Sequence, residues 1–159
     1  MRAIIKKDRA PGVEYVNIPK PEPKDNEVLI KVKATAICGT DYSCWKWNAA
    51  GEKFNDKYGA QYPFVLGAAV KDIKVGDKVA IETHIYCGEC YQCRTGDAHN
   101  CQHLKIYGIS CDGCFAEYAT APANCCFVLP EAVSYEQGAL FEPAGVAMFG
   151  LREANVRAG

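Results

Sequence analysis

The sequence lacks several features that would place it in common protein classes. No apolar run approaches the ~18 residues of a membrane-spanning helix, so no membrane protein is expected. Neither sign of charge is in excess, because the formal net charge is only −1, and nucleic acid is therefore not an expected partner. The positively charged start is not followed by a long apolar stretch, which argues against an export signal.

Two residue patterns used for cofactor binding are also scarce. Only three histidines occur, His84, His99 and His103, which is few for a histidine-rich metal site. The pattern Gly-x-Gly is absent from the whole chain. Because that glycine-rich turn holds the pyrophosphate of a dinucleotide, the sequence predicts no nucleotide site of its own.

Cysteine, in contrast, is abundant, with ten residues in a chain of 159. Small exported domains use that many cysteines for disulfides, but this sequence shows no export signal. We therefore expect a cytoplasmic protein whose clustered thiols bind metal.

The spacing of apolar residues and turn residues predicts a β-rich chain. Strands are expected at residues 2–7, 13–18, 27–35, 63–66, 77–82, 114–119 and 125–129, the first two as a hairpin. Short strands first and helices last indicate a mainly β, barrel-like domain with peripheral helices.

Helix signals are concentrated in two segments. A short helix is expected at residues 38–47, capped by Thr40 or Asp41, and a glycine-containing loop is expected at 48–62. Residues 134–154 form the best helical segment, because Ser134 and Gln137 make a capping box. Pro143 must kink or divide this helix.

Four cysteines within residues 83–105 follow the spacing C-x2-C-x2-C-x7-C: Cys87, Cys90, Cys93 and Cys101. Two residues between thiolates let the backbone aim both sulfurs at one point, as a tetrahedral zinc site requires. We expect one structural Zn²⁺ per chain, whose binding folds a lobe that has no hydrophobic core. An iron–sulfur cluster and disulfides are the two alternatives.

Five motifs occur in the order found in zinc-dependent medium-chain alcohol dehydrogenases. They are Ile37-Cys38-Gly39-Thr40-Asp41, Gly76-Asp77-Lys78-Val79, the four-cysteine lobe, Phe115-Ala116-Glu117-Tyr118 and Phe141-Glu142-Pro143. The chain resembles the GroES-like catalytic domain of this family, and Trp45 and Trp47 resemble its threonine and polyol branch. The resemblance implies a partly open β-barrel over residues 1–159, with a zinc lobe at 83–105 and a helical segment at 134–154.

The same resemblance implies a second, catalytic zinc that polarises the hydroxyl of a small secondary alcohol, threonine or a polyol, before hydride passes to NAD. Cys38 matches a ligand of that zinc, Thr40 the hydroxyl that relays the proton, and Glu142 a carboxylate at or near the metal. Considered alone, Cys38 could also be a buried thiol.

The sequence departs from the family pattern after Gly67. Ala68-Ala69 stands where the family carries a His-Glu pair, and the strand-turn-strand that should follow is missing. The gap is natural, engineered or an omitted segment. Alanine cannot bind zinc, so Cys38 and Glu142 are left as an incomplete catalytic site, with His84 expected to be a hydrogen-bonded structural residue. Ser43 also replaces a relay histidine that many relatives carry.

The family's Rossmann NAD domain is expected to be absent, so NAD would bind only in a full-length parent. We therefore expect a catalytic-domain fragment that is inactive alone. The alternative is a minimised or engineered GroES-like module that only binds zinc. Loss of the second domain would expose an apolar face at residues 141–149 and favour self-association.

Five further cysteines match no family site: Cys44, Cys111, Cys114, Cys125 and Cys126. We expect them to be small buried thiols, because this is a common environment for cysteine. A second metal half-site built from residues 111, 114, 125 and 126 is the alternative.

Overall fold

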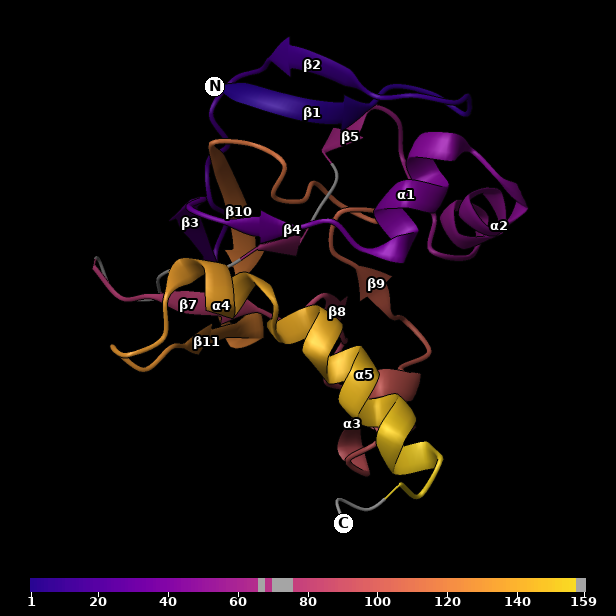
Figure 1. Ribbon diagram of the computed structural model, residues 1–159, viewed down its shortest axis with the longest axis vertical. Coiled ribbons are helices and arrows are strands. Elements are labelled where there is room, and N and C mark those ends of the chain that lie inside the picture. Colours follow the sequence, from indigo (N-terminus) through magenta and orange to yellow (C-terminus); the bar gives the residue numbers. More distant parts are fainter. Residues whose placement is uncertain (66–67, 70–75, 157–159) are drawn as a thin grey trace.

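The computed structural model describes residues 1–65, 68–69 and 76–156 (Figure 1). The strands are β1 (Arg2–Lys6), β2 (Glu14–Asn17), β3 (Glu27–Lys31), β4 (Thr35–Ala36), β5 (Phe64–Val65), β6 (Ala68–Ala69), β7 (Val79–Ile81), β8 (His84–Ile85), β9 (Lys105–Ile106), β10 (Tyr118–Pro122) and β11 (Cys126–Val128). The helices are α1 (Gly39–Lys46), α2 (Ala49–Lys57), α3 (Tyr91–Arg94), η1 (Ala98–Asn100), η2 (Ala123–Cys125), α4 (Tyr135–Ala139) and α5 (Phe141–Glu153).

The N-terminal hairpin is confirmed, and β1 lies at the centre of a three-stranded antiparallel sheet of order β2-β1-β5. A second contact fixes β1 to the chain just before β10. The guanidinium of Arg2 donates to Glu117 Oε1 from Nε at 3.0 Å and from Nη2 at 2.7 Å. The sheet is therefore joined to residues far along the chain.

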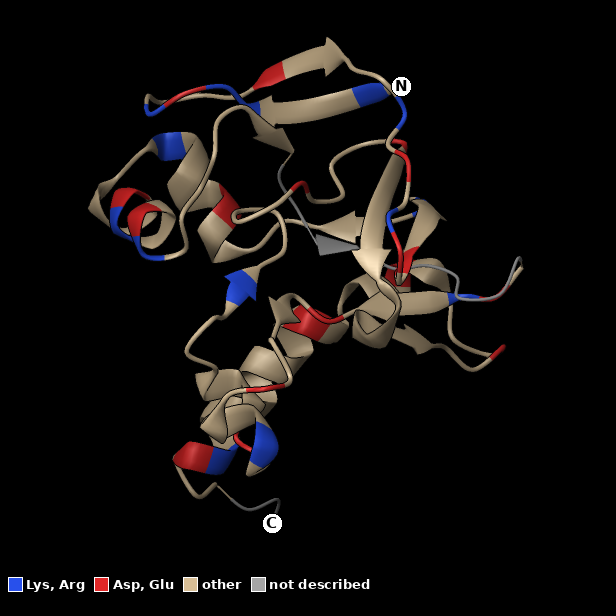
Figure 2. Cartoon of the chain, turned by 180° about the vertical axis from the view of Figure 1, so that it is seen from behind, with Lys and Arg blue, Asp and Glu red and all other residues tan. Residues whose placement is uncertain are grey.

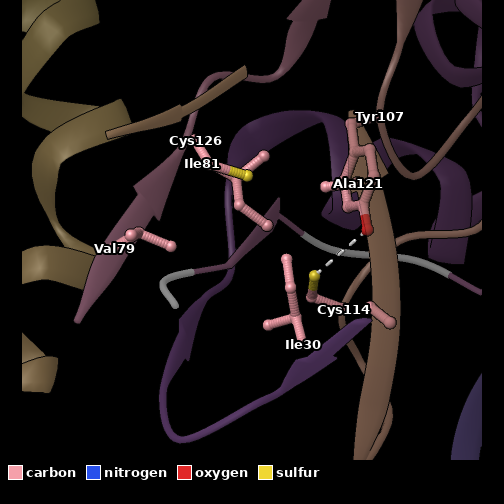
Figure 3. Packing of buried hydrophobic residues seen from close by; sticks show 8 residues of the cluster. Ile30, Val79, Ile81, Tyr107, Cys114, Ala121 and Cys126 are labelled. Atoms are coloured by element: carbon pink, nitrogen blue, oxygen red, sulfur yellow. Dashed lines mark hydrogen bonds between the residues drawn. The ribbon is translucent and has the colours of Figure 1, made fainter. Parts of the chain in front are cut away.

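The main core lies between the β3-β10 and β7-β11 ladders (Figure 3). Its buried residues are Ile30, Val79, Ile81, Tyr107, Cys114, Ala119, Ala121 and Cys126. Successive strand residues point to opposite faces, so β3 and β7 each place alternate apolar side chains inward. In the described part of the chain the strands form small separate sheets and no closed barrel, in agreement with the partly open arrangement.

The strand expected at residues 114–119 begins later than predicted, because its first part pairs elsewhere. Ile4 donates its N–H to the carbonyl of Phe115 at 2.7 Å, and Glu117 donates to Arg2 at 3.1 Å. The chain then leaves β1 and pairs with β3 as β10. The alternation of apolar residues could not predict that the segment pairs first with β1 and then with β3. The strand expected at 27–35 likewise ends at Lys31.

The prediction of a loop at residues 48–62 is wrong, because helix α2 occupies most of this segment. The side chain of Asn48 caps this helix by accepting the N–H of Gly51 at 2.9 Å. Gly51 permits close contact with α1, since a Cβ there would lie 2.3 Å from the carbonyl oxygen of Ser43. This glycine therefore serves helix packing and does not mark a loop.

The C-terminal helical segment is confirmed, including its capping box. Ser134 donates its N–H to Gln137 Oε1 at 2.8 Å, and Gln137 donates its N–H to Ser134 Oγ at 3.2 Å. The helix divides at Leu140, which leaves Pro143 in the first turn of α5. A proline in that turn breaks no helical hydrogen bond, because the first N–H groups have no partner within the helix.

No residue of α5 is buried, and the helix projects from the sheets (Figure 1). The predicted junction after Phe64-Val65 lies outside the described residues, except for β6, which pairs antiparallel with β4. None of the helices in the described ranges has the length and apolar character needed to span a lipid bilayer.

Candidate functional site

The structure brings together all four cysteines that the sequence singled out in the lobe. Their Sγ atoms lie within 4.8 Å of one another. Neighbouring sulfurs are 3.5 Å apart for Cys90 and Cys93, 3.6 Å for Cys87 and Cys101, 3.8 Å for Cys90 and Cys101, and 3.9 Å for Cys87 and Cys93. A tetrahedron with zinc–sulfur bonds of about 2.3 Å has edges of about 3.8 Å. The sulfurs therefore fit a tetrahedral zinc ion.

Local backbone structure holds the four sulfurs in place. Helix α3 begins directly after Cys90, and η1 leads into Cys101. Gly88 and Gly96 turn the chain with φ values of 77° and 86°, which favour glycine. The lobe is attached to the body through the β8-β9 ladder, where His84 pairs with Ile106.

Backbone N–H groups point at these sulfurs and stabilise negative charge on some of them. His103 donates to Cys101 Sγ at 3.3 Å, and Cys90 donates to Cys87 Sγ at 3.4 Å. The N–H groups of Cys93 and Gln102 lower the pKa of Cys90 to about 6. Desolvation and the neighbouring thiol of Cys90 raise the pKa of Cys93 to about 12. Adjacent thiolates repel one another, and a cation among them would offset that repulsion.

The second candidate region is a cavity of about 120 Å³ that α1, α2, β4, β7 to β9, α4 and α5 enclose. It adjoins a cleft of about 540 Å³ between α1, α2 and α5. Both hollows are lined by Cys38, Thr40, Phe54, Glu142 and Pro143. The structure thus brings Glu142 to the same place as Cys38 and Thr40, from which it is distant in sequence.

Cys38 is the N-cap of α1, so the predicted cap at Thr40 or Asp41 is wrong. Asp41 instead sits at the third helical position, where its carboxylate accepts the N–H of Cys38 at 2.9 Å. The Cys38 sulfur in turn faces the N–H of Asp41, as in a capping box. Burial raises the pKa of the Cys38 thiol, and the backbone N–H groups of Asp41 and Thr40 only partly oppose that shift.

Charged groups face one another across the cavity. Burial, and then the charge of Asp41, raise the pKa of Glu142, while His84 lowers it. His84 Nδ1 lies 2.7 Å from Glu82 Oε1, and this hydrogen bond raises the pKa of His84. His84 thus lines the cavity with its Nδ1 bound to a neighbouring carboxylate.

Within the part of the chain that the structure describes, the cavity does not offer the ligands of a catalytic zinc. Among the described residues, the lobe cysteines are the only group of three or more metal-binding side chains close enough to share an ion. Cys38, His84 and Glu142 line one cavity without forming such a group. Because a catalytic zinc needs about three protein ligands, these residues do not fit one. Ala68 lies beside this region, since it pairs with the cavity-lining Ala36.

The cysteines outside the lobe also form no metal-binding group in the described residues. Cys44, Cys114, Cys125 and Cys126 are buried and Cys111 is partly buried, as expected for small core thiols. Burial raises the pKa of Cys114 to about 12 and that of Cys126 to about 11. All ten cysteines of the chain are free thiols, so the disulfide alternative is not formed here.

Phe54 and Glu82 are two residues of the cavity region that sequence reasoning missed. Phe54 lines the cavity because α2 carries it there, and reading Asn48 as a helix cap would have revealed that helix. Glu82 orients His84, and no local sequence signal pointed to this role.

Comparison with known proteins identifies the family. Residues 24–131 match the alcohol dehydrogenase GroES-like domain, and the chain belongs to this family of zinc-dependent dehydrogenases. L-threonine 3-dehydrogenase of Pyrococcus abyssi is 43% identical over 154 residues, which cover 93% of this chain and 44% of that protein. The chain thus spans about half the length of the curated relatives it matches.

Solved structures agree with this assignment. A putative zinc-binding dehydrogenase from Clostridium scindens aligns with a TM-score of 0.81 and 30% identity, covering 100% of this chain and 49% of that one. Galactitol-1-phosphate dehydrogenase from Escherichia coli aligns with a TM-score of 0.78 and 27% identity, covering 98% and 45%. The resemblance proposed from the sequence motifs is confirmed at the level of the family and its fold.

Proposed function

We propose that the chain is the catalytic-domain part of an NAD-linked, zinc-dependent dehydrogenase that oxidises a small secondary alcohol, L-threonine or a polyol. The similarity to L-threonine 3-dehydrogenase, at 43% identity over 93% of the chain, carries this proposal. The gathering of Cys38, Thr40 and Glu142 around one cavity supports it.

In this proposal Cys87, Cys90, Cys93 and Cys101 hold one structural zinc ion, which supplies folding free energy to residues 83–105. The sulfur spacing of 3.5 to 3.9 Å supports that assignment. Residues 1–159 then act as one GroES-like catalytic domain, with the helical segment 134–154 at its end.

The cavity residues have proton-handling roles. Thr40 accepts a hydrogen bond from the substrate hydroxyl and relays its proton. Glu142, whose pKa is raised by burial, holds a proton more readily than an exposed carboxyl. NAD, when bound in a full-length parent, supplies the hydride acceptor. Cys38 keeps the position of a metal ligand, but the site is incomplete, and we therefore expect the isolated chain to be inactive.

A second candidate function is a GroES-like zinc-binding module without activity. Ala68-Ala69 at the position of the family's His-Glu pair favours it. In both cases we propose a reducing, cytoplasmic location, which the ten free thiols support. We also propose self-association through the apolar surface of α5, where Val146, Met148 and Phe149 are exposed.

Metal counting and an activity assay test these proposals. We expect about one zinc ion per chain by elemental analysis, and no alcohol-dependent formation of NADH. Two zinc ions with NADH formation would show an active domain, and absence of zinc would contradict the lobe assignment.

A substitution within the lobe tests which residues bind the metal. Cys90→Ser removes one of four ligands, so bound zinc should be lost and residues 83–105 should become sensitive to protease. Cys111→Ser is the matched control, because this partly buried thiol lies outside the lobe, and its zinc content should equal that of the parent. Unchanged zinc content in Cys90→Ser would contradict the assignment.

A further inference from the structure

The ten cysteines differ strongly in their access to solvent. Cys87 is the one exposed cysteine, and all ten lie within the described ranges. Cys44, Cys114, Cys125 and Cys126 are buried, and burial raises the pKa of each of these thiols. Because the thiolate is the form that reacts with oxidants, these four are poor targets.

Cys87 also lies next to a second sulfur. Cys101 Sγ is 3.6 Å from Cys87 Sγ, while Cys93 Sγ is 3.9 Å away. Cys101 is buried, so an oxidant reaches Cys87 first. We propose that Cys87 is a site of oxidative modification, and that peroxide converts Cys87 and Cys101 to a disulfide with release of the lobe's metal ion. The inference rests on the zinc assignment proposed above.

The proposed reaction balances with peroxide as the only oxidant. The Cys87 thiolate attacks one peroxide oxygen, the O–O bond breaks, and hydroxide leaves to give a sulfenic acid. The Cys101 thiolate then attacks the Cys87 sulfur, the S–O bond breaks, and a second hydroxide leaves. Two thiolates are oxidised, peroxide is reduced to two waters after uptake of two protons, and Zn²⁺ departs. Cys90 and Cys93 alone cannot retain the ion, because a closed site needs four ligands.

The position of the lobe gives this modification a consequence for the cavity. The β8-β9 ladder connects the lobe to the body through only two residue pairs, His84 with Ile106 and Ile85 with Lys105. His84 and Ile106 also line the cavity. Loss of the metal therefore loosens one wall of the cavity, so oxidation of Cys87 would control the shape of the site from outside it.

The test treats the reduced, zinc-containing full chain with hydrogen peroxide and follows zinc release with a chromogenic chelator. We expect about one zinc ion released per peroxide consumed. Peptide mapping after alkylation should find a species linking residues 87 and 101 that is lighter by two hydrogen atoms. Reduction with dithiothreitol and added zinc should restore the starting metal content. Cys111→Ser should release zinc like the parent.

The outcomes separate this inference from the zinc assignment. A chain that contains no zinc before oxidation would overturn both. A chain that holds one zinc but retains it while other cysteines are oxidised would overturn only the modification site. Zinc release with a disulfide between Cys90 and Cys93, and none at Cys87, would also overturn it.

Discussion

At the scale of single residues, the pair formed by His84 and Glu82 shows how charge is arranged at the edge of the cavity. Their side chains are 46% and 42% exposed, so solvent screens the interaction. Such a pair contributes at most about 1 kcal/mol to stability. Its hydrogen bond raises the pKa of His84 and lowers the pKa of Glu82.

These shifts predict a pH-dependent effect of Glu82→Gln. His84 contributes fully below its ordinary pKa of 6.5, and its contribution is lost as the pH rises through the raised value. Glu82 contributes fully above its ordinary 4.5, and its contribution is lost as the pH falls through the lowered value. We therefore expect Glu82→Gln to destabilise most near pH 6, by less than about 1 kcal/mol, and least near pH 9.

Urea denaturation at the two pH values measures this difference. Glu22→Gln, at an exposed position before β3, serves as the control and should show no such dependence. An equal loss of stability at both pH values for Glu82→Gln would show that the ion pair does not form.

The lobe cysteines and the cavity residues differ in how far sequence could predict them. The spacing of Cys87, Cys90 and Cys93 was enough to predict that their sulfurs meet, because the short loop between them sets their positions locally. The grouping of Cys38 with Glu142 came from family motifs, since no local rule connects residues so distant. Asp41 escaped prediction as a partner of Cys38 because cysteine was not considered as a cap.

At the scale of elements, the contact between α1 and α2 depends on one missing side chain. The carbonyl of Ser43 occupies the place where a Cβ of residue 51 would lie, at 2.3 Å. Backbone cannot move as easily as a side-chain tip, so the two helices would have to separate. The lining residue Phe54 would move with α2, because this helix carries it into the cavity.

Gly51→Ala should therefore destabilise the fold by about 2 kcal/mol, within the range found for overpacked sites. Gly145→Ala is the matched control, because nothing lies within 4 Å of its Cβ position in α5. Alanine is the better helix former, so this control should gain about 0.5–1 kcal/mol. Chemical denaturation compares the two, and a gain in stability for Gly51→Ala would contradict the close helix contact.

Element prediction succeeded where the signal was local and failed where tertiary contacts decided. The capping box at Ser134 and the turn between β1 and β2 depend on neighbouring residues, and both were predicted. The glycine at position 51 suggested a loop, because its role depends on α1. The segment around Phe115 reads as a single strand, yet it changes partner from β1 to β3 along its length.

At the scale of the whole molecule, α5 presents an apolar surface to solvent. Its charged residues are confined to its two ends, where Glu142 lies in the first turn and Arg152 in the last (Figure 2). Met148 and Phe149 are 65% and 58% exposed. Contiguous apolar surface of this kind favours association.

We expect the chain to self-associate in a concentration-dependent manner. The double variant Met148→Glu and Phe149→Glu should shift the chain toward monomer, because two charges interrupt the apolar surface of α5. The cavity and the cleft should be unaffected, because neither residue lines them. Glu153→Gln, at the end of the same helix, is the control. Sedimentation velocity measures the shift in oligomeric state. An unsubstituted chain that is monomeric at every concentration would contradict the expectation.

The contacts within the lobe and those within the sheets differ strongly in the sequence separation of the residues that they join. Cys87 and Cys101 are 14 positions apart, whereas Arg2 must find Glu117 across 115 positions. Closing a short loop costs less entropy than closing a long one, and contacts between distant segments slow folding. The lobe can therefore fold before strand β1 has formed its contacts with the segment around Glu117. A nascent chain that binds the proposed zinc ion would then carry a metal-bound nucleus before its hydrophobic interior is complete.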